Sequence, residues 1–345
     1  ALIIYLSFGI TVQLGMIVRC LLVTSVDAIE AGECELPAPG PGEVLIETSY
    51  SGISPGTELR ALAGKQDGMP QYPFIPGYSL SGVVVETGPG CALPIGARVL
   101  TGGTRHASVN RLWGGHISHA VRAEREVYRI PDNVDLRDAA LTRLLAIAYH
   151  GVRLSHPAAH ETVAVVGLGP IGQLSARLHG VSGAQVVAAD LSPERVDRAR
   201  AAGVEAFVLE GDLVEGFQRY FPTGADVVAD STGAKAVLPQ AIELAKIPTW
   251  GDGPLAPSRF LIQGSYPGDI MLPYNVAFLR EAQILFPRDC QPGDIEAVLD
   301  LLHRERLKVA DLRETVRRPE EAPETYAELK SAKSGMLTAI FDWKA

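Results

Sequence analysis

Cysteine is scarce in this sequence of 345 residues, which contains only four of them. No two form a C-x-x-C pair, and their spacings match no pattern of zinc ligands. A reduced, cytoplasmic protein is the simplest interpretation, because disulfides are rare in that compartment. The four cysteines are Cys20, Cys34, Cys91 and Cys290.

Clustered basic charge is also missing. The net charge is −9, and no run of lysine or arginine occurs. Nucleic acids and anionic membranes are bound through a basic footprint, so neither is an expected partner. Apolar residues make up 47% and charged residues 21%, the mixture of an ordinary globular protein. The length favours two domains.

The chain begins with an uncharged segment, ALIIYLSFGITVQLG, over residues 1–15. It is too short to span a bilayer, which needs about 20 apolar residues. It also lacks the basic region that opens a signal peptide. Met16 then opens MIVRCLLVTS, which reads as a first strand. We expect residues 1–15 to be an upstream extension, the alternative being a genuine extra strand.

The pattern of strands and helices changes along the chain. Residues 17–150 contain short apolar segments separated by Gly- and Pro-rich turns, which favours a β-barrel-like domain. AALTRLLAIAYHGVRL, from residue 139, has the apolar stripe of a helix. Strand and helix patterns then alternate, as expected for a parallel sheet covered by helices on both faces.

A glycine-rich motif marks the second region. GLGPIG follows the strand pattern TVAVV and opens a helix, and Asp190 ends the next strand, 18 residues after Gly172. This combination predicts a dinucleotide site, with a tight turn at Gly167, close approach of the pyrophosphate at Gly169 and close helix packing at Gly172. The motif residues are Gly167, Leu168, Gly169, Pro170, Ile171 and Gly172.

Asp190 favours NAD over NADP, because its carboxylate would accept hydrogen bonds from the ribose hydroxyls. A 2′-phosphate at about 4 Å would be repelled by about 4 kcal/mol at an effective dielectric near 20. The alternatives are a flavin or nucleotide-sugar site, or an Asp190 that only caps a helix.

Several of these motifs together resemble the medium-chain dehydrogenase/reductase superfamily, of the alcohol dehydrogenase type. They are AYHGV, VAVVGLGPIG and DLSPERVDRARAAG. The resemblance implies a GroES-like catalytic barrel, a Rossmann coenzyme domain and an active site between them. The expected domains are 16–151 with 293–345, and 152–292. We expect the coenzyme site to be completed by Arg195, Thr232 and Gly264.

The family's zinc ligands are replaced in this sequence, so no metal is expected. Ser54 stands where zinc enzymes have Cys, Tyr78 and Ser79 replace the His–Glu pair, and Arg143 falls near the third ligand. The structural zinc lobe is missing too. The loop GISPGTE and the motif PGY resemble a zinc-lacking branch that includes bacteriochlorophyllide a dehydrogenase, with similar proteins in bacterial secondary metabolism.

Without zinc, the family's chemistry needs other groups to handle the proton. Thr57 matches the family's proton-relaying hydroxyl. Glu58 matches the acid behind it and is expected to orient the other groups, the alternative being that it acts as a base. Tyr78 can donate to a carbonyl or, if deprotonated, accept a proton, the alternative being that it fills space. Ser54 is a further candidate, or it only caps the loop.

Two basic side chains complete the candidates. Arg143 could replace part of the lost positive charge, the alternative being an ion pair with an acid such as Asp138. His150, in AYHGV, would lie near the nicotinamide, or be a structural histidine. His106, His116 and His119 lie in strand-like segments and are expected to be structural.

The leading prediction is a zinc-independent NAD(H) oxidoreductase that interconverts a secondary alcohol and a ketone. An ene- or imine-reductase of the zinc-free quinone reductase type is an alternative that Asp190 disfavours, since those relatives commonly use NADPH. A non-catalytic coenzyme-binding sensor or scaffold is another. The expected partner is a small-molecule substrate, and the resemblance also allows a homodimer.

Overall fold

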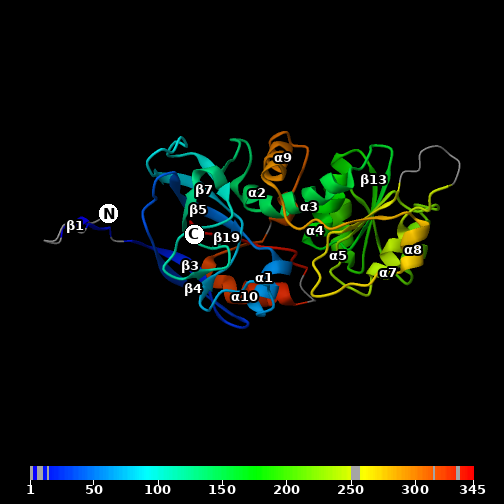
Figure 1. Cartoon of the computed structure of the whole chain (residues 1–345), viewed down its shortest axis with the longest axis horizontal. Helices are drawn as coiled ribbons and strands as arrows, with labels where there is room; N and C mark the ends of the chain where they lie inside the picture. The colour runs from blue at the N-terminus through cyan, green and yellow to red at the C-terminus, as the bar shows by residue number, and fades with distance from the viewer. Residues whose placement is uncertain (1–2, 6–10, 14, 250–256, 314, 332–334) are drawn as a thin grey trace. The chain divides into compact units, whose positions relative to one another are not determined.

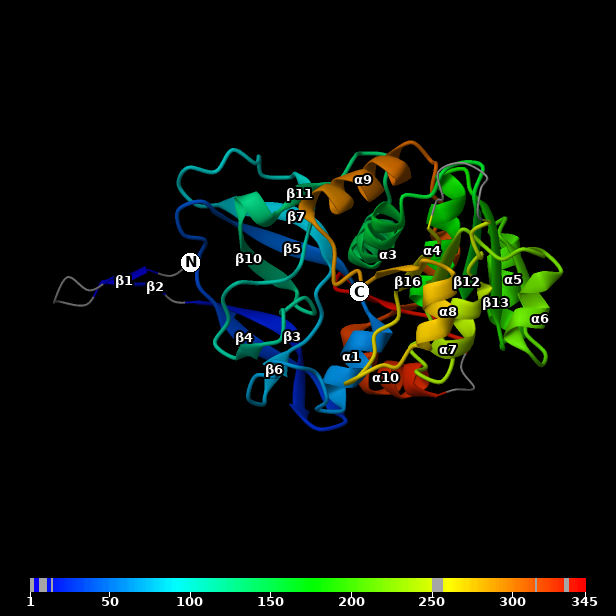
Figure 2. The same ribbon diagram turned by 45° about the vertical axis from the view of Figure 1, so that its right-hand side comes forward.

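The computed structural model describes the whole chain except residues 1–2, 6–10, 14, 250–256, 314 and 332–334 (Figures 1 and 2). The chain forms two compact units. The terminal unit joins Ala1–Arg143 to Val309–Ala345, and the central unit is Leu144–Lys308. The domain boundaries predicted from the sequence differ, at 151/152 and 292/293, because they leave the helices that flank the central sheet in the terminal domain.

Two main sheets build the terminal unit. One has the strand order β11-β8-β7-β5-β19-β18, with β10 also paired to β5, and the other has the order β4-β3-β6-β9. β19 pairs antiparallel with β5, so both ends of the chain complete one sheet. Their bounds are β3 Met16–Ser25, β4 Ala28–Leu36, β5 Glu43–Gly52, β6 Phe74–Ile75, β7 Leu80–Thr87, β8 Arg98–Thr101, β9 Asn110–Arg111, β10 His119–Ala123, β11 Tyr128–Arg129, β18 Val316–Arg317 and β19 Ile340–Asp342.

A separate two-stranded sheet precedes them. β1 (Ile3–Tyr5) and β2 (Thr11–Gln13) pair antiparallel with each other. This pairing does not test the expectation that residues 1–15 are an upstream extension, which stays a prediction. The helices of the terminal unit are α1 Pro55–Leu62, η1 Glu124–Glu126, α2 Leu136–Ala140, η3 Ala310–Leu312, η4 Pro319–Glu321 and α10 Ala322–Lys330.

The chain turns sharply from strand to helix after β5. A Cβ on Gly52 would lie 2.5 Å from the carbonyl oxygen of Ala140, so only glycine allows α2 to pack this closely. Ser54 is extended and occupies the N-cap position of α1, where its side chain forms no capping hydrogen bond, and Pro55 supplies the fixed φ that suits a first helical position. The segment SPGTEL, which the sequence pattern describes as a loop, is therefore the start of a helix.

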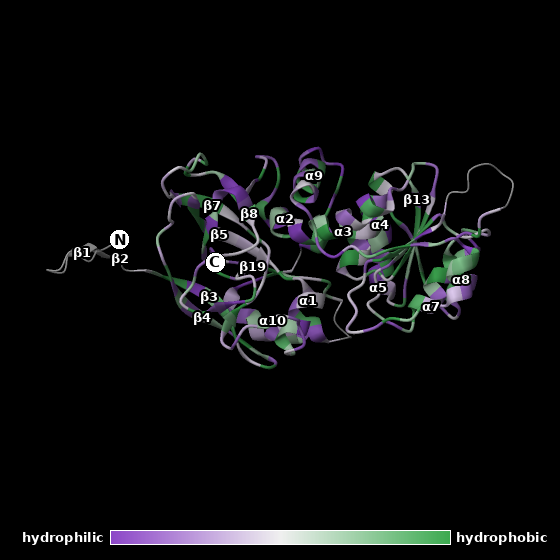
Figure 3. Ribbon diagram, viewed as in Figure 1, coloured by the Kyte–Doolittle hydropathy of each residue, from purple (hydrophilic) through white to green (hydrophobic). Residues whose placement is uncertain are grey.

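The central unit is built on a six-stranded parallel sheet with the order β14-β13-β12-β15-β16-β17. Its strands are apolar, as the hydropathy colouring shows (Figure 3), and their side chains at the centre of the sheet are fully buried. This arrangement confirms the predicted parallel sheet. The strands are β12 Thr162–Val166, β13 Gln185–Asp190, β14 Glu205–Val208, β15 Val227–Asp230, β16 Arg259–Ile262 and β17 Gln283–Leu285.

The strand order reverses next to β12, which pairs with β13 on one side and with β15 on the other. In open parallel sheets, ligands bind at the carboxyl ends of the strands where the order reverses. The topology therefore places the candidate coenzyme site beyond the ends of β12 and β15. The helices of the unit are α3 Thr142–Ser155, α4 Pro170–Val181, α5 Pro193–Ala201, α6 Leu213–Gln218, α7 Leu238–Ala241, η2 Ile242–Leu244, α8 Tyr274–Leu279 and α9 Pro292–His303.

Candidate active site

The glycine-rich loop has the geometry that its sequence predicts. Gly167 has a φ of +87°, and a Cβ on Gly172 would lie 1.8 Å from the Gly167 carbonyl oxygen, so α4 packs directly on the turn. A Cβ on Gly169 would meet no atom within 4 Å, which leaves open space at the helix start. Near this turn, the Ser231 hydroxyl is buried and has no hydrogen-bond partner among the described residues. These features fit a bound pyrophosphate.

Asp190 braces this loop. Its Oδ2 accepts a hydrogen bond from the amide of Leu168 at 2.6 Å, and its Oδ1 accepts one from the amide of Ser192 at 2.9 Å. A guanidinium nitrogen of Arg195 lies 3.6 Å from Oδ2. The carboxylate thus ties the turn to the start of α5, and its remaining lone pairs are those available to a ribose.

The other predicted coenzyme residues lie at the ends of the neighbouring strands. Thr232 follows β15 and donates from its hydroxyl to Asp230 at 2.8 Å. A Cβ on Gly167 would approach the Thr232 methyl group to 2.9 Å, so Thr232 packs against the glycine-rich turn. Gly264 follows β16, and a Cβ there would crowd the Gly233 amide at 2.8 Å. The topology thus groups these residues, whose roles stay predictions.

One pair in this region was missed by the sequence analysis. The hydroxyl of Tyr266 donates to the carboxylate of Asp230, a fully buried residue. Burial raises the pKa of Asp230, and burial also raises the pKa of Tyr266. No motif signals the pair, because the two residues come from different strand ends.

In the terminal unit, four predicted catalytic residues converge, namely Ser54, Thr57, Glu58 and Tyr78. The Tyr78 hydroxyl donates to the Ser54 hydroxyl, and both side chains are buried. Burial is the main cause that raises the pKa of Tyr78 to about 12. The charge of Glu58 adds to the rise, whereas hydrogen bonds with Ser54 and Thr57 oppose it. The phenol therefore holds its proton at neutral pH.

Arg143 lies over the same phenol. Its guanidinium carbon is 5.8 Å from the centroid of the Tyr78 ring, a distance typical of cation–π contacts. Trp113 meets the Tyr78 ring edge-on at 5.2 Å and was missed by the sequence analysis. Asp138, the acid suggested as a partner of Arg143, lies 2.5 Å from the guanidinium of Arg313.

Glu58 lies behind this cluster and is 1% exposed. Its Oε1 accepts from the backbone amide of Ser54 at 2.7 Å. Its Oε2 is 2.8 Å from Nε2 of His116 and accepts from the Tyr326 hydroxyl at 2.5 Å. His116 and Tyr326 were not predicted here, because they lie 58 and 268 residues from Glu58.

His150 has its own partner in the central unit. Its Nδ1 lies 2.8 Å from Oδ2 of Asp294, a fully buried residue of α9, and Arg153 contacts the other carboxylate oxygen at 2.9 Å. These contacts tie α3 to α9. They support the structural alternative for His150, and its position near the nicotinamide stays a prediction.

The residues at the former ligand positions do not fit a zinc ion. Zinc in proteins is bound by thiolate, imidazole or carboxylate groups. Here the positions carry the hydroxyls of Ser54 and Ser79, the phenol of Tyr78 and a guanidinium, and Ser79 donates to the Ala140 carbonyl at 2.6 Å. In the described part of the chain, no group of three or more His, Cys, Asp or Glu side chains could hold a metal.

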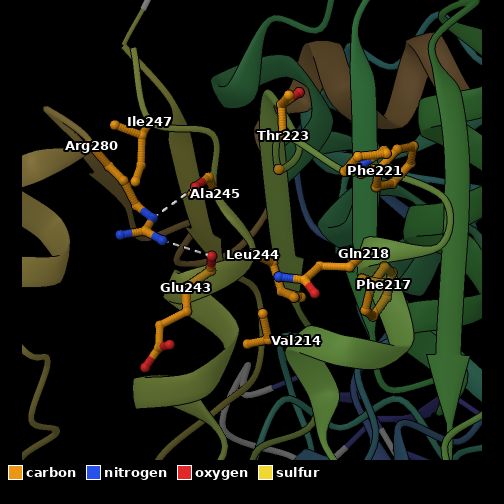
Figure 4. Close-up of a pocket in the computed structure, with 12 residues that line it drawn as sticks. Val214, Phe217, Gln218, Phe221, Thr223, Glu243, Leu244, Ala245, Ile247 and Arg280 are labelled. Carbon is orange, nitrogen blue, oxygen red and sulfur yellow. Dashed lines mark hydrogen bonds between the residues drawn. The ribbon is translucent and has the colours of Figure 1, made fainter. Parts of the chain in front are cut away.

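A hollow of about 400 Å³ lies elsewhere in the central unit, beside α6 and η2 (Figure 4). It is lined by Phe217 and Phe221 and by the Arg280 side chain, whose guanidinium donates to the carbonyls of Ala245 and Glu243 at 2.7 and 2.9 Å. The lining residues Phe221 and Gly224 come just before β15 in the chain, so the hollow lies at the edge of the sheet where the strands begin. The glycine-rich loop follows β12 at the opposite edge.

Two family models match the chain. An alcohol dehydrogenase GroES-like domain matches residues 40–132, and a zinc-binding dehydrogenase matches residues 170–248. They fall on the terminal and central units respectively.

Whole-length relatives agree with these matches. The 2-desacetyl-2-hydroxyethyl bacteriochlorophyllide A dehydrogenase of Cereibacter sphaeroides is 28% identical, over 90% of this chain and 93% of its own. The 2-dehydro-3-deoxy-L-galactonate 5-dehydrogenase of Pseudoalteromonas atlantica is 30% identical, over 60% of this chain and 67% of its own.

Solved structures show the same fold. An alcohol dehydrogenase from Escherichia coli, complexed with NADH, has a TM-score of 0.82 at 19% sequence identity. The matched region is 95% of this chain and 100% of the E. coli chain. A dehydrogenase from Sinorhizobium meliloti, bound to NADP, has a TM-score of 0.82 at 24% sequence identity. The matched region is 95% of this chain and 99% of the S. meliloti chain.

The chain belongs to the medium-chain dehydrogenase/reductase superfamily. This confirms the predicted family and its GroES-like and Rossmann folds. The protein is an oxidoreductase of the alcohol dehydrogenase type, which interconverts alcohols and carbonyl compounds with a nicotinamide coenzyme. None of the described helices has the length and apolar character needed to cross a membrane.

Proposed function

We propose that this enzyme interconverts a secondary alcohol and a ketone with NAD(H), without zinc, in bacterial secondary metabolism. The observation that carries the proposal is the buried Tyr78–Ser54 hydrogen bond, formed by residues at two zinc-ligand positions. The bacteriochlorophyllide relative is named for a substrate that carries a hydroxyethyl group, and this supports a secondary alcohol as the substrate.

Zinc acidifies bound water from a pKa of 15.7 to about 7, a change worth about 12 kcal/mol. A site without it must stabilise the substrate oxygen in another way. Tyr78 holds its proton at neutral pH and can donate it to a substrate oxygen. Ser54 and Thr57 share hydrogen bonds with the phenol, and the charge of Arg143 favours its anion.

The bound coenzyme donates or accepts the hydride, and the chain's residues handle only the proton. In ketone reduction, the Tyr78 proton moves to the substrate oxygen as the carbon receives hydride. Thr57 then connects the phenol to the exposed side of α1, since its side chain is half-buried. Alcohol oxidation reverses these steps and begins with a deprotonated phenol. The protonated phenol is the form that ketone reduction uses, and the raised pKa keeps Tyr78 in that form at neutral pH.

NAD is the proposed coenzyme because Asp190 carries negative charge at the end of β13. Repulsion of a 2′-phosphate by about 4 kcal/mol disfavours NADP by about a thousandfold. Arg195, at 3.6 Å from the carboxylate, offsets part of this repulsion. The same residue pair is therefore where the preference can be altered.

We also propose a homodimer through the exposed side of α8 and the edge strand β17. Tyr274, Phe278 and Leu279 of α8 are 74%, 62% and 58% exposed, and α8 is coloured hydrophobic in Figure 3. β17 ends the sheet and pairs only with β16 among the described strands. An open edge beside an apolar helix suits a second copy of the chain.

A cytoplasmic location fits the four free cysteines.

A screen of secondary alcohols and ketones with NAD(H), followed by nicotinamide absorbance, tests the function. Turnover of a ketone or alcohol supports it. Turnover of only activated alkenes or imines would establish the reductase alternative. Tight NADH binding with no turnover of any compound would favour a sensor or scaffold.

A further inference from the structure

Behind Tyr78 lies a chain of buried polar groups that the proposed chemistry does not use. The indole nitrogen of Trp343 donates to the Ser51 hydroxyl at 2.8 Å. The same hydroxyl is 2.8 Å from Nδ1 of His116, and Nε2 of His116 is 2.8 Å from Glu58. Ser51 and His116 are fully buried.

One arrangement of protons satisfies every member of this chain. The Trp343 indole can only donate, so the Ser51 oxygen accepts and its own proton is free for Nδ1 of His116. His116 then donates from Nε2 to Glu58, whose carboxylate only accepts. Tyr326 donates to the same carboxylate oxygen at 2.5 Å. In this arrangement Nε2 of His116 donates to Glu58 and Nδ1 accepts from Ser51, so the neighbours fix the orientation of the ring.

The carboxylate of Glu58 depends on these donors. A buried charge is stable only when hydrogen bonds replace its water, and removing one partner leaves it uncompensated. Glu58 has His116 and Tyr326 on one oxygen and the Ser54 amide on the other. The third of these bonds attaches the carboxylate to the residue that receives the Tyr78 hydrogen bond.

His116 also contacts the segment that carries Tyr78. A Cβ added to Gly77 would lie 2.6 Å from the imidazole ring, so the ring packs against the backbone just before Tyr78. The imidazole thus lies between two segments. On one side it supports Glu58 and through it Ser54, and on the other side it supports the peptide at Gly77.

We propose that His116 is a positioning residue that sets the separation of the Ser54 and Tyr78 hydroxyls by holding Glu58 on one side and the Gly77 backbone on the other. The inference rests on the proposed role of Tyr78 in catalysis. It assigns His116 no contact with the substrate, and it explains why a histidine, rather than an apolar residue, is buried at this position.

Two matched substitutions test the inference. His116→Gln places an amide near the former Nε2, where it can still donate to Glu58. His116→Asn reaches only as far as the former Nδ1 and loses that bond. We expect His116→Asn to lower kcat by about 10², the loss that a small misplacement of a catalytic group causes, while His116→Gln keeps most of the activity. NADH affinity, measured by nicotinamide fluorescence, should stay unchanged in both.

His106→Gln is the control. His106 forms a comparable pair with Glu43, at 2.9 Å, but its side chain is 45% exposed. This variant should have the kcat of the parent enzyme. Equal kcat in the Asn, Gln and parent proteins would overturn the inference. So would parallel losses of kcat, NADH affinity and melting temperature, because they indicate general unfolding.

A second measurement holds even if His116→Asn does not fold. With Glu58→Gln, no buried charge is left uncompensated, so adding His116→Asn should give a folded protein whose kcat is lowered by much less than 10² relative to Glu58→Gln alone. Strict additivity would contradict the coupling. If Tyr78→Phe itself leaves kcat unchanged, the proposed function fails. If Tyr78→Phe lowers kcat and the His116 variants do not, only this inference fails.

Discussion

The two units build their candidate sites in opposite ways. In the central unit, the glycine-rich turn and Asp190 lie within one short stretch that runs from β12 to β13. In the terminal unit, the hydrogen bonds around Tyr78 and Glu58 join residues 24, 58 and 268 positions apart. The first site is a local backbone structure, and the second exists only after the sheets have paired.

The two sites also use different chemistry. Backbone amides and the absence of side chains shape the coenzyme loop, so its tolerance of substitution depends on space. Hydroxyl, phenol, carboxylate and imidazole groups shape the Tyr78 cluster, so its tolerance depends on hydrogen bonds and charge. Changes in the first site should affect coenzyme binding, and changes in the second should affect turnover.

The largest effect is expected at Gly172. Gly172→Val puts a side chain where even a Cβ would lie 1.8 Å from the Gly167 oxygen, so NADH binding should be lost, or the central unit should fail to fold. Fluorescence titration and circular dichroism measure the two effects. Gly180→Ala, in the same helix with open space around it, is the control and should bind NADH normally. Normal binding by Gly172→Val would show that the loop geometry is wrong.

Tyr78→Phe should have the next largest effect. General acid–base groups contribute about 10² to 10⁴-fold, so kcat should fall by a factor in this range, with NADH affinity unchanged. Thr57→Val should reduce kcat as well, by less, and the double variant shows whether the two act together. Tyr72→Phe, at a partly exposed ring, is the control. Near-normal kcat in the double variant would make the cluster structural only.

Coenzyme preference should change at Asp190. Asp190→Asn removes the charge and keeps an oxygen for one of the two amide bonds. The preference for NADH over NADPH should narrow, by up to about a thousandfold. Asp190→Ser should weaken both coenzymes in addition, because it also loosens the loop. Asp197→Asn, on the exposed face of α5, is the control. Equal affinities for both coenzymes in the parent protein would contradict the assignment to NAD.

A smaller effect is expected at high pH. The folded protein holds the Tyr78 proton more tightly than the unfolded chain does, because burial raises the pKa from 10.0 to about 12. This contribution to stability is present below pH 10 and is lost as the pH rises toward 12. At pH 10.5 the loss is about 1 kcal/mol relative to pH 8. Urea unfolding at the two pH values measures the free energy of unfolding of the parent and of Tyr78→Phe. Its decrease from pH 8 to pH 10.5 should be larger in the parent by this amount, and equal decreases would refute the prediction.

The smallest effect is expected from metal removal. Prolonged dialysis against a chelator should leave kcat unchanged, since hydroxyl, phenol and guanidinium groups stand at the zinc-ligand positions. Elemental analysis before and after dialysis is the control. Zinc at one ion per chain that is lost together with activity would overturn the proposal of a zinc-independent mechanism.

Much of the fold could be predicted from the sequence. The alternation of strands and helices after residue 160 is a local pattern, and it became the parallel sheet of the central unit. The loop geometry followed from glycines whose roles depend on neighbouring residues. The start of α1 was described as a loop, because Pro55 and Gly56 are common in both loops and first helical turns.

The sequence by itself determined the coenzyme loop, the position of Asp190 and the loss of the zinc ligands, because each is a matter of residue type at a local spacing. Only the tertiary structure decided which groups replace them. Trp113, His116 and Tyr326 join the Tyr78 cluster from segments that meet through sheet pairing and the packing of α10 against α1. Arg143 lies over the Tyr78 ring for the same reason. Hydrogen bonds between distant segments depend on how the chain closes on itself, and no periodicity in the sequence records that closure.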